Sequence, residues 1–494
     1  MIGFGLASGA LHLARWHPPV FKIPFLAGEG LGHVLLAVVI AVGVWLALKG
    51  GAHWNLSPLT RKKLQRFRAI RRGYVSFLIL LALIGVASLD SLLVGKRALV
   101  VSYQGKWSFP FMREVIPGKT FGLDYDAETD YRDLQAKCRA ENKGDWVIMP
   151  PVPYASALDS PSIIESLETR DGKVFRHGDS RPFNGIAYTV FVTNQEQKRQ
   201  EFQYRGGLRH GDFRGWNDAG DQIEKGRYDN GKRTAYTDFT NGKAAALESQ
   251  AHFELKRAVY PPSPPSVRHR HYLGTNSTGI DVLATLFGGL QQAVIAAVLF
   301  VTMVFATGVL VGGTLGYFGG MLDLVGQRLI EIWSVLPFLF VVMIISSLIS
   351  PTLTVLVGLL AMFGWMGTTS YLRTATFKER ERDYVAAARL LGASTPRIIF
   401  HHVLPNVIAI LVTLAPFEVA GVITSLAALD FLGFGLPPDE PSWGRLLHEG
   451  VDNFAYPWIV SSAFVAMASV LMLVTFVGEA VREAFDPKKF TTYE

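Results

Sequence analysis

The chain has 494 residues, of which 49% are hydrophobic, and it carries a formal net charge of +7 at pH 7. A soluble protein of this size does not usually hide so large an apolar fraction in one core, so the composition indicates a membrane protein. The excess positive charge lies beside apolar runs, which explains it without nucleic acid, and a single cysteine, Cys138, excludes an intramolecular disulfide.

Residues 1–72 are predicted to be an N-terminal extension. A run at about 31–48 contains no Asp, Glu, Lys or Arg and is close to the length that a helix needs to cross a bilayer. It begins well into the chain and lacks a small-residue cleavage site, so we interpret it as a retained extra transmembrane helix rather than a signal peptide. The basic linker that follows has no acid up to residue 72, and the positive-inside rule places it in the cytoplasm.

A second apolar run, within 73–96, is predicted to be the first core transmembrane helix. Counting spans from the cytoplasmic linker places the polar region 97–272 in the periplasm. Within it, residues at about 157–258 resemble a β-sheet of MORN-like repeats, and two interpretations of this insert stay open: a small sheet that packs only on its neighbours, and a docking surface for a partner. Its signals are an aromatic residue followed by a glycine turn at 204–211, 228–232 and 239–243, with hairpin-forming Asn-Gly pairs at 230–231 and 241–242.

Residues 273–494 are predicted to be a compact helical core with five transmembrane helices. The run 282–322 is interpreted as one span, roughly 292–315, with a surface-lying approach. The run 332–372 is too long for one span and is predicted to hold two, with a hairpin at Ser350-Pro351. The last two spans are predicted at 404–429 and 454–478, which makes seven in the whole chain and leaves the C-terminus in the cytoplasm.

The cytoplasmic segment 379–405 between two of these spans carries the most informative motif. Its first part, 379–391, is a strong helix former, in which Ala386, Ala387 and Ala388 leave a low surface that can pack into the groove of another protein. Gly392 is predicted to end this helix, and Pro405 stands where the next membrane helix begins. A short rigid helix between two spans can pass the motion of a neighbouring protein into the membrane.

This segment resembles the EAA loop of ABC-importer permeases. Two positions depart from the family pattern, since Ala386 replaces a Glu and His402 replaces an Ile. Without that Glu, docking of an ATPase rests more on shape and on Arg382, Arg389 or Glu381. The positions that fall on the pattern with the full spacing are Ala387, Ala388, Gly392, Leu404 and Pro405.

Other segments resemble the dipeptide and oligopeptide permeases of this group. The first is 271–283, in which Asn276 and Ile280 depart from the family pattern. Further matching segments are 316–320, 431–436, 441–444 and 478–487. Segments 71–74, 105–111 and 429–437 are most similar to the microcin C-type permeases, and the resemblance as a whole covers roughly 57–156 and 259–490.

The resemblance implies the transmembrane domain of a type I ABC importer, an α-helical polytopic protein of the bacterial inner membrane that moves peptides or peptide-like compounds into the cytoplasm. The implied partners are cytoplasmic ATP-binding subunits, a second homologous permease in a heterodimer, a periplasmic substrate-binding protein and the lipid bilayer. The chain is then a non-catalytic subunit without a cofactor, and opine, nickel and sugar-peptide cargo stay open. The residues expected to couple to the ATPase are Ala386, Ala387, Ala388, Arg389, Gly392, Leu404 and Pro405.

Other features of the sequence give weaker signals. Gly118-Lys119-Thr120 ends like a phosphate-binding loop, but Arg113 stands where the first glycine must be, and the histidines near 270 and 401 lack partners at metal-ligand spacing. Glu418 lies inside a predicted span, where it is either a candidate residue of the translocation pathway or a paired structural group. The alternatives to a permease are a membrane-anchored envelope scaffold that works through its β insert, and a membrane-embedded enzyme, which would need catalytic groups that converge.

Overall fold

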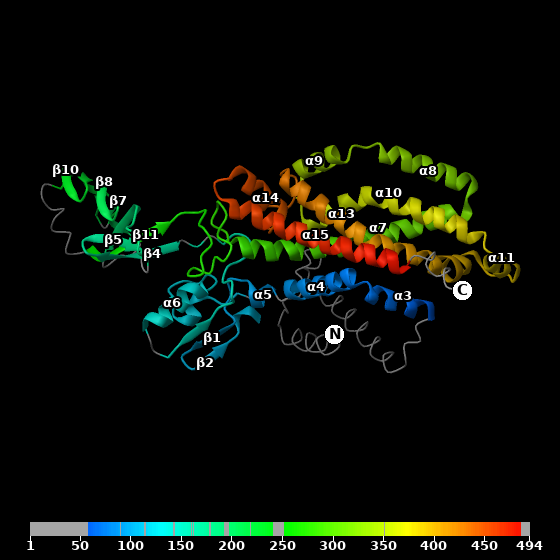
Figure 1. Ribbon diagram of the computed structural model, residues 1–494, viewed down its shortest axis with the longest axis horizontal. Helices are drawn as coiled ribbons and strands as arrows, with labels where there is room; N and C mark the ends of the chain where they lie inside the picture. Colours follow the sequence, from blue (N-terminus) through cyan, green and yellow to red (C-terminus); the bar gives the residue numbers. More distant parts are fainter. Residues whose placement is uncertain are drawn as a thin grey trace. The chain divides into compact units, whose positions relative to one another are not determined.

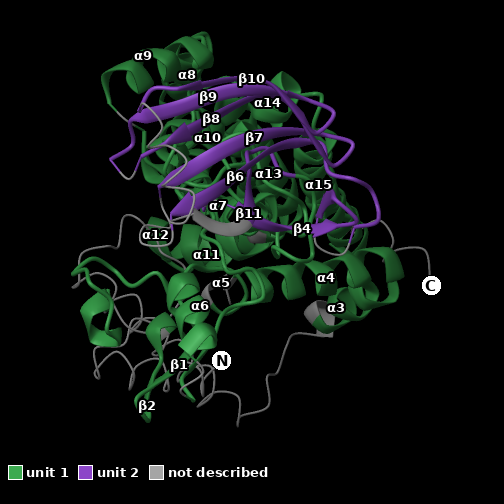
Figure 2. Cartoon of the chain, turned by 90° about the vertical axis from the view of Figure 1, so that its left-hand side faces the viewer, with its two compact units in different colours: residues 1–159, 264–494 green, residues 160–263 purple. Residues whose placement is uncertain are grey.

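The computed structural model describes residues 58–485, except residues 89, 113–114, 142–143, 160, 162, 177–178, 192–196, 218, 241–250 and 350. The predicted extra helix at 31–48 and the predicted hairpin turn at 241–242 lie outside the described residues. The chain forms two compact units, residues 1–159 with 264–494 and residues 160–263 (Figure 2).

The first unit is mainly helical (Figure 1). Four of its helices, α7, α10, α13 and α15, are long and apolar enough to cross a membrane, and the bent pairs α3 with α4 and α8 with α9 raise the number of candidate spans in the described residues to six. The sequence predicts six spans over the same residues, so the chain is a polytopic α-helical membrane protein. The helices are α3 (Pro58–Ala69), α4 (Arg71–Ser88), α7 (Val282–Phe318), α8 (Gly320–Ser334), α9 (Phe338–Leu348), α10 (Leu353–Arg380), α13 (Leu404–Phe431), α14 (Trp443–Asp452) and α15 (Pro457–Phe485).

Two of these spans differ in shape from the prediction. α7 is one continuous helix of 37 residues, so the expected surface-lying approach before residue 292 is wrong. The first of the two spans predicted in the run 332–372 begins earlier than expected, with α8 at Gly320, and the chain bends by 66° between α8 and α9. Pro337 stands directly before α9 and has no N–H with which to continue α8. Hydropathy does not reveal this bend, because the turn between the helices lies inside the apolar run 332–372.

α7 and α10 pack closely along a row of glycines on α7. A Cβ atom added to Gly308 would lie 2.8 Å from a side-chain methyl of α10, and one added to Gly312 would lie 2.6 Å from the carbonyl oxygen of Thr369. One turn further, a Cβ on Gly316 would lie 2.5 Å from the carbonyl oxygen of Arg373. Four-residue spacing puts the three glycines on one helix face, where the lack of side chains lets the two backbones touch. Because α10 leads directly into segment 379–405, this contact also positions that segment.

The first unit also contains a small α/β part between α4 and α7. A three-stranded antiparallel sheet has the order β2 (Lys106–Ser108), β1 (Val100–Tyr103) and β3 (Trp146–Ile148). Leu134 and Cys138 of α6 (Tyr131–Glu141) pack on this sheet and form its core with Val101 and Val147. The short helices of this part are α5 (Asp90–Leu93), η2 (Pro110–Met112) and η3 (Gly118–Phe121).

The second unit is an eight-stranded antiparallel sheet in the order β10-β9-β8-β7-β6-β11-β4-β5 (Figure 2). The predicted hairpin at 230–231 is confirmed, since Asn230 and Gly231 have φ values of 45° and 85° between β9 and β10. The first and last strands pair with each other, with Ile163 opposite Val259. The strands are β4 (Ile163–Arg170), β5 (Lys173–Arg176), β6 (Gly185–Phe191), β7 (Lys198–Arg205), β8 (Leu208–Trp216), β9 (Gln222–Asp229), β10 (Lys232–Asp238) and β11 (Ala251–Val259).

The repeated aromatic residues of this sheet pack on one another. Phe202, Phe213 and Tyr236 occupy one row across β7, β8 and β10, and Gly226 of β9 stands between the last two. A Cβ on Gly226 would collide with the Phe213 ring, so the glycine lets Phe213 and Tyr236 stack at 6.2 Å across it. The aromatic and glycine pattern of the sequence therefore has a packing role, and a docking role for this sheet stays a prediction.

Candidate functional site

Residues 379–405, which are expected to couple to an ATPase, are named the coupling segment. α10 ends at Arg380, and the predicted continuous helix over 379–391 is wrong, because Arg382 adopts an extended conformation and a new helix begins after it. Helix propensity alone does not reveal this break, since the charged residues around it favour a helix. The elements that follow are α11 (Asp383–Leu390), α12 (Thr395–Arg397) and the π-helix η5 (Ile398–Val403), which leads into α13.

α11 ends in a turn that favours glycine. Gly392 has a φ of +80°, in the left-handed region, and its N–H donates to the Arg389 carbonyl at 3.0 Å. The N–H of Ala393 donates to the Ala388 carbonyl at 3.1 Å. These two bonds form a Schellman motif, in which glycine is preferred because it lacks a Cβ. The predicted helix end at Gly392 is confirmed.

Gly392→Ala should weaken this turn through backbone conformation alone. A Cβ on Gly392 would meet no heavy atom within 4 Å, so the expected loss of about 1 kcal/mol comes from the left-handed φ. Gly392→Asn is the matched control, because Asn tolerates this region better, and it should keep most of the stability. Thermal melting of the purified chain measures both variants, and an alanine variant as stable as the native chain would contradict the expectation.

One face of α11 packs into the helical bundle. Val385 is fully buried and Ala388 is 8% exposed, whereas Ala386 and Ala387 are exposed. The low surface predicted for the three alanines is therefore divided, and only two of them face outward. α11 packs against three long helices at once, because the cluster around it draws on α7, α10 and α13. Its buried members are Tyr317, Leu372, Val385, Ala388, Ile398, Val403, Val407 and Leu411.

The Tyr384 hydroxyl ties the two arms of the coupling segment together. It donates to the Glu379 carboxylate at 2.6 Å and accepts from the side-chain amide of Asn406 at 2.9 Å. Burial and the nearby carboxylate raise the pKa of Tyr384 above its ordinary value, so the phenol stays a neutral donor at pH 7. α10, α11 and α13 are thus joined by one polar side chain as well as by the apolar cluster.

Leu404 and Pro405 lie at the start of α13. The Leu404 N–H donates to the carbonyl of Ile399, five residues back, as in a π-helix. Pro405 has no N–H, so its place in the first turn of α13 leaves no donor unsatisfied. Leu404 is half-buried and Pro405 is exposed. These two predicted residues therefore lie where the π-helix ends and α13 begins.

The outward side of α11 ends in two exposed leucines. Leu390 is 90% exposed and Leu391 is 87% exposed, the highest values among the large apolar side chains of the described residues. Removing a leucine from water is worth about 1.5–3 kcal/mol, so this pair is a strong candidate for burial against a partner. The sequence prediction did not single out these two leucines.

The charged residues predicted to assist docking have contacts within the chain. Glu381 pairs with Arg380 at 2.9 Å, and Arg382 lies 3.8 Å from the last acidic side chain of α10. The Arg389 guanidinium lies 6.0 Å above the Tyr317 ring. The leucines therefore offer the larger unpartnered surface.

A chain of contacts leads from the coupling segment to α8. Arg373 of α10 donates from Nη2 to Asp323 Oδ2 at 2.5 Å and from Nε to Oδ1, and Asp323 is 8% exposed. The Phe377 ring lies between two guanidinium groups, at 5.0 Å from Arg373 and 4.6 Å from Arg380. Arg380 in turn donates to the carbonyl of Tyr317, at the end of α7, at 2.9 Å. The sequence prediction did not single out these residues.

Glu418 on α13 faces a threonine of α10. The fully buried Thr368 donates from Oγ1 to Glu418 Oε1 at 2.9 Å. This contact favours the structural interpretation, in which the carboxyl group is paired inside the bundle. A place for Glu418 on the translocation pathway stays a prediction.

The segment 271–283, one of those that resemble the peptide permeases, caps the N-terminus of α7. Asp281 Oδ1 accepts from the Ala284 N–H at 2.7 Å, and its other oxygen lies 2.7 Å from Nδ1 of the buried His271. The departure from the family pattern at Asn276 has a physical reason. Asn276 Nδ2 donates to Glu449 of α14 at 3.1 Å, which an ionised carboxylate could not do.

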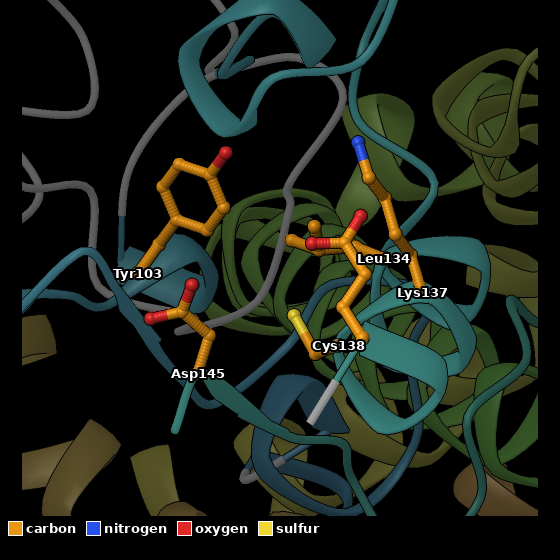
Figure 3. Close-up of a pocket in the computed structure, with 6 residues that line it drawn as sticks. Tyr103, Leu134, Lys137, Cys138 and Asp145 are labelled. Atoms are coloured by element: carbon orange, nitrogen blue, oxygen red, sulfur yellow. The ribbon is translucent and has the colours of Figure 1, made fainter. Parts of the chain in front are cut away.

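A small pocket in the small α/β part is a weaker candidate (Figure 3). Two of its polar groups are engaged locally, since Lys137 Nζ donates to the Gly122 carbonyl at 2.7 Å and Asp145 accepts from the Gln104 N–H at 2.8 Å. Among the described residues, no group of three or more His, Cys, Asp or Glu side chains could hold a metal ion.

Comparisons with known proteins show the family of this chain. Residues 308–491 match the family described as "Binding-protein-dependent transport system inner membrane component". The chain is 32% identical over 435 residues to the inner membrane ABC transporter permease protein YejE of Escherichia coli (strain K12), with 88% of this chain and 99% of that protein covered. It is 30% identical over 433 residues to the peptidoglycan transport system permease protein YejE of Agrobacterium fabrum, with 88% and 94% covered.

A shorter match links the chain to a further group of transporters. The chain is 36% identical over 231 residues to the oligopeptide transport system permease protein OppC of Mycobacterium bovis, with 45% of this chain and 77% of that protein covered. The match to the Escherichia coli YejE protein extends over nearly its whole length, and the resemblance inferred from the sequence motifs is confirmed. The chain belongs to the family of binding-protein-dependent inner-membrane permeases of ABC transporters.

Proposed function

We propose that this permease imports peptides or peptide-like compounds into the cytoplasm, and that separate subunits hydrolyse the ATP. Inward transport is supported by the family description, since a binding protein delivers its substrate from outside. The cargo class is supported by two relatives, one named for oligopeptide transport and one for peptidoglycan transport. A peptide, free or attached to a cell-wall fragment, is the chemistry that these two names share.

The proposed arrangement in the inner membrane follows the charge pattern. The basic residues of 58–72 and the coupling segment lie in the cytoplasm with the C-terminus, and the region 97–272 lies in the periplasm, where a substrate-binding protein delivers cargo. A second permease completes the pathway in a heterodimer.

The observation that carries the proposal is the two-sided build of α11. Its inward face is locked to α7, α10 and α13 through Val385 and Ala388, and its outward end presents Leu390 and Leu391. A docked ATPase covers the leucines beside Ala386 and Ala387, and its movement then passes through the buried face into the spans. The shape of the segment depends on the turn at Gly392 and on the start of α13 at Leu404 and Pro405. Arg389 contributes a contact with the Tyr317 ring of α7.

Affinity purification from the native membrane in mild detergent tests this proposal. The native chain should bring down an ATPase and a second permease, and the double variant Leu390→Glu with Leu391→Glu should reduce the co-purifying ATPase at least tenfold. In the native chain, burial of each leucine against the ATPase contributes about 1.5–3 kcal/mol to the binding free energy. Because about 1.4 kcal/mol corresponds to a tenfold change in affinity, loss of this burial is enough for the expected reduction. Mass spectrometry and ATPase assay give the readout.

Leu158→Glu is the matched control, because Leu158 is 75% exposed in the region proposed to be periplasmic and should not affect the ATPase. If the double variant keeps its ATPase, the coupling segment does not dock through these leucines. If the native chain comes down with envelope proteins alone, the scaffold alternative replaces the importer. Uptake of a labelled tripeptide by cells with and without the permease then tests the cargo class.

A further inference from the structure

α3 carries a dense group of cations on a short helix. Residues 58–72 contain no Asp or Glu, so this charge is not balanced within the segment. A helix with this composition is too polar to enter the hydrocarbon core of a membrane. The cations are Arg61, Lys62, Lys63, Arg66 and Arg68, followed by Arg71 and Arg72 at the start of α4.

α3 turns away from α4 at a fixed angle. The two helices bend by 93° at the break between them, and together they form one of the bent candidate spans. Phe67 of α3 holds the bend, because its ring contacts the rings of Tyr74 at 6.2 Å and Phe77 at 5.8 Å. In a straight helix, ten residues separate two positions by about 15 Å along the axis, so the contact with Phe77 requires the turn.

α4 exposes apolar side chains of the kind that face lipid. Val75 is 52% exposed, Leu78 is 46% exposed and Leu81 is 56% exposed. If these residues lie in the hydrocarbon core, a helix at 93° to α4 runs along the membrane surface and does not cross it. α3 is also anchored to the end of α15, where the Lys63 amine lies 4.8 Å above the Phe485 ring.

The two faces of α3 differ. Lys63, Arg66 and Phe67 are half-buried against the bundle, whereas Arg61, Lys62 and Arg68 are exposed. Leu64, 45% exposed, lies three residues after Arg61 and four before Arg68, so the two cations flank it on one helix face. An apolar side chain between two arginines fits the boundary between lipid headgroups and acyl chains.

We propose that α3 is an in-plane helix that binds anionic phospholipid headgroups through Arg61, Lys62 and Arg68, with Leu64 inserted between them. Charge complementarity selects the partner, since a segment with seven cations and no acid favours a phosphate that carries net negative charge over a zwitterionic headgroup. The planar guanidinium groups can each hold a phosphate through two parallel hydrogen bonds. This binding is separate from transport and requires neither cargo nor ATPase.

Fluorescence quenching at the helix itself tests the proposal with the full-length chain. Cys138→Ser removes the only cysteine, and Gln65→Cys supplies an exposed position on α3 for a bimane label. The labelled protein is placed in bilayers of phosphatidylcholine with increasing brominated phosphatidylglycerol, and the quenching curve gives the relative affinity of the two lipids at α3. We expect a clear preference for phosphatidylglycerol.

The variant Arg61→Gln with Lys62→Gln and Arg68→Gln should lose this preference, by about fivefold for each cation, since each contributes about 1 kcal/mol near an anionic surface. Arg61→Lys with Arg68→Lys keeps the charge and should keep most of the preference. About 1 M salt should abolish the preference in the starting protein, because the screening length falls to about 3 Å.

A matched control neutralises Arg214, Lys225 and Arg227, three exposed cations of the second unit, and should leave quenching at α3 unchanged. The proposal is overturned if the α3 variant keeps its preference for phosphatidylglycerol, or if this control loses it equally, which would indicate a net-charge effect. It is also overturned if inorganic phosphate at constant ionic strength removes the preference, since the site would then bind free phosphate. Melting temperatures of all variants establish that they are folded.

Discussion

Gly312→Leu should prevent the permease from reaching a stable fold, whereas Gly313→Leu, one residue later, should be tolerated. A Cβ on Gly312 already lies 2.6 Å from the carbonyl oxygen of Thr369 and 3.1 Å from the backbone nitrogen of Arg373, and a backbone cannot move aside as a side chain can. A leucine there forces α7 and α10 apart, so its penalty should exceed the range of about 1–3 kcal/mol for ordinary overpacking. A Cβ on Gly313 meets no heavy atom within 4 Å.

The yield of monodisperse protein in detergent and its melting temperature give the result. The Gly312 variant should aggregate or melt far below the native chain, and the Gly313 variant should behave like it. Equal behaviour of the two variants would show that α7 and α10 do not pack through this row of glycines.

Arg373→Met should be more damaging than the double variant Arg373→Met with Asp323→Leu. The single change leaves the carboxylate of Asp323, 8% exposed, without the guanidinium that binds it. Removing one partner of a buried ion pair lowers the free energy of unfolding by about 3–5 kcal/mol, and we expect a value near the lower limit. Replacing both partners with apolar groups is often close to neutral. The double variant should therefore recover most of the stability.

Arg328→Met on the same helix as Asp323 is the matched control, because its pair with Glu331 is exposed, with side chains at 70% and 57%, and should be worth at most about 1 kcal/mol. Unfolding of the native chain, Arg373→Met, Asp323→Leu and the double variant gives the interaction free energy as a double-mutant cycle. Transport by the double variant is the sharper readout. If Arg373 and Asp323 carry motion from the coupling segment to α8, that variant is stable but transports poorly. Full transport by it would show that the pair only stabilises the bundle.

Local signals predicted a large part of this protein. Apolar runs located the spans, the Asn-Gly pair located the hairpin at 230–231, and Gly392 marked the end of α11. Each of these features depends on residues that are close together in the sequence. The resemblance to the EAA loop depends on spacing within one segment, and that spacing is enough to indicate the family.

The features that the sequence did not predict depend on distant residues. Arg373 and Asp323 are fifty positions apart, and nothing in either neighbourhood indicates the other. The exposure of Leu390 and Leu391 depends on how α11 packs against α7, α10 and α13, and the local sequence does not show that packing. The break before Pro337 was hidden in an apolar run, since hydropathy measures solubility in lipid and not helix direction.

The pairing of Ile163 with Val259 has a consequence for the history of the chain. Neighbouring strands lie about 4.7–4.9 Å apart, so the chain enters the second unit and leaves it at almost the same point in space. A module attached in this way can be gained, lost or exchanged in a single genetic event without moving the parts that flank it. The fold of the helical unit can thus be retained while the sequence of the inserted sheet diverges independently.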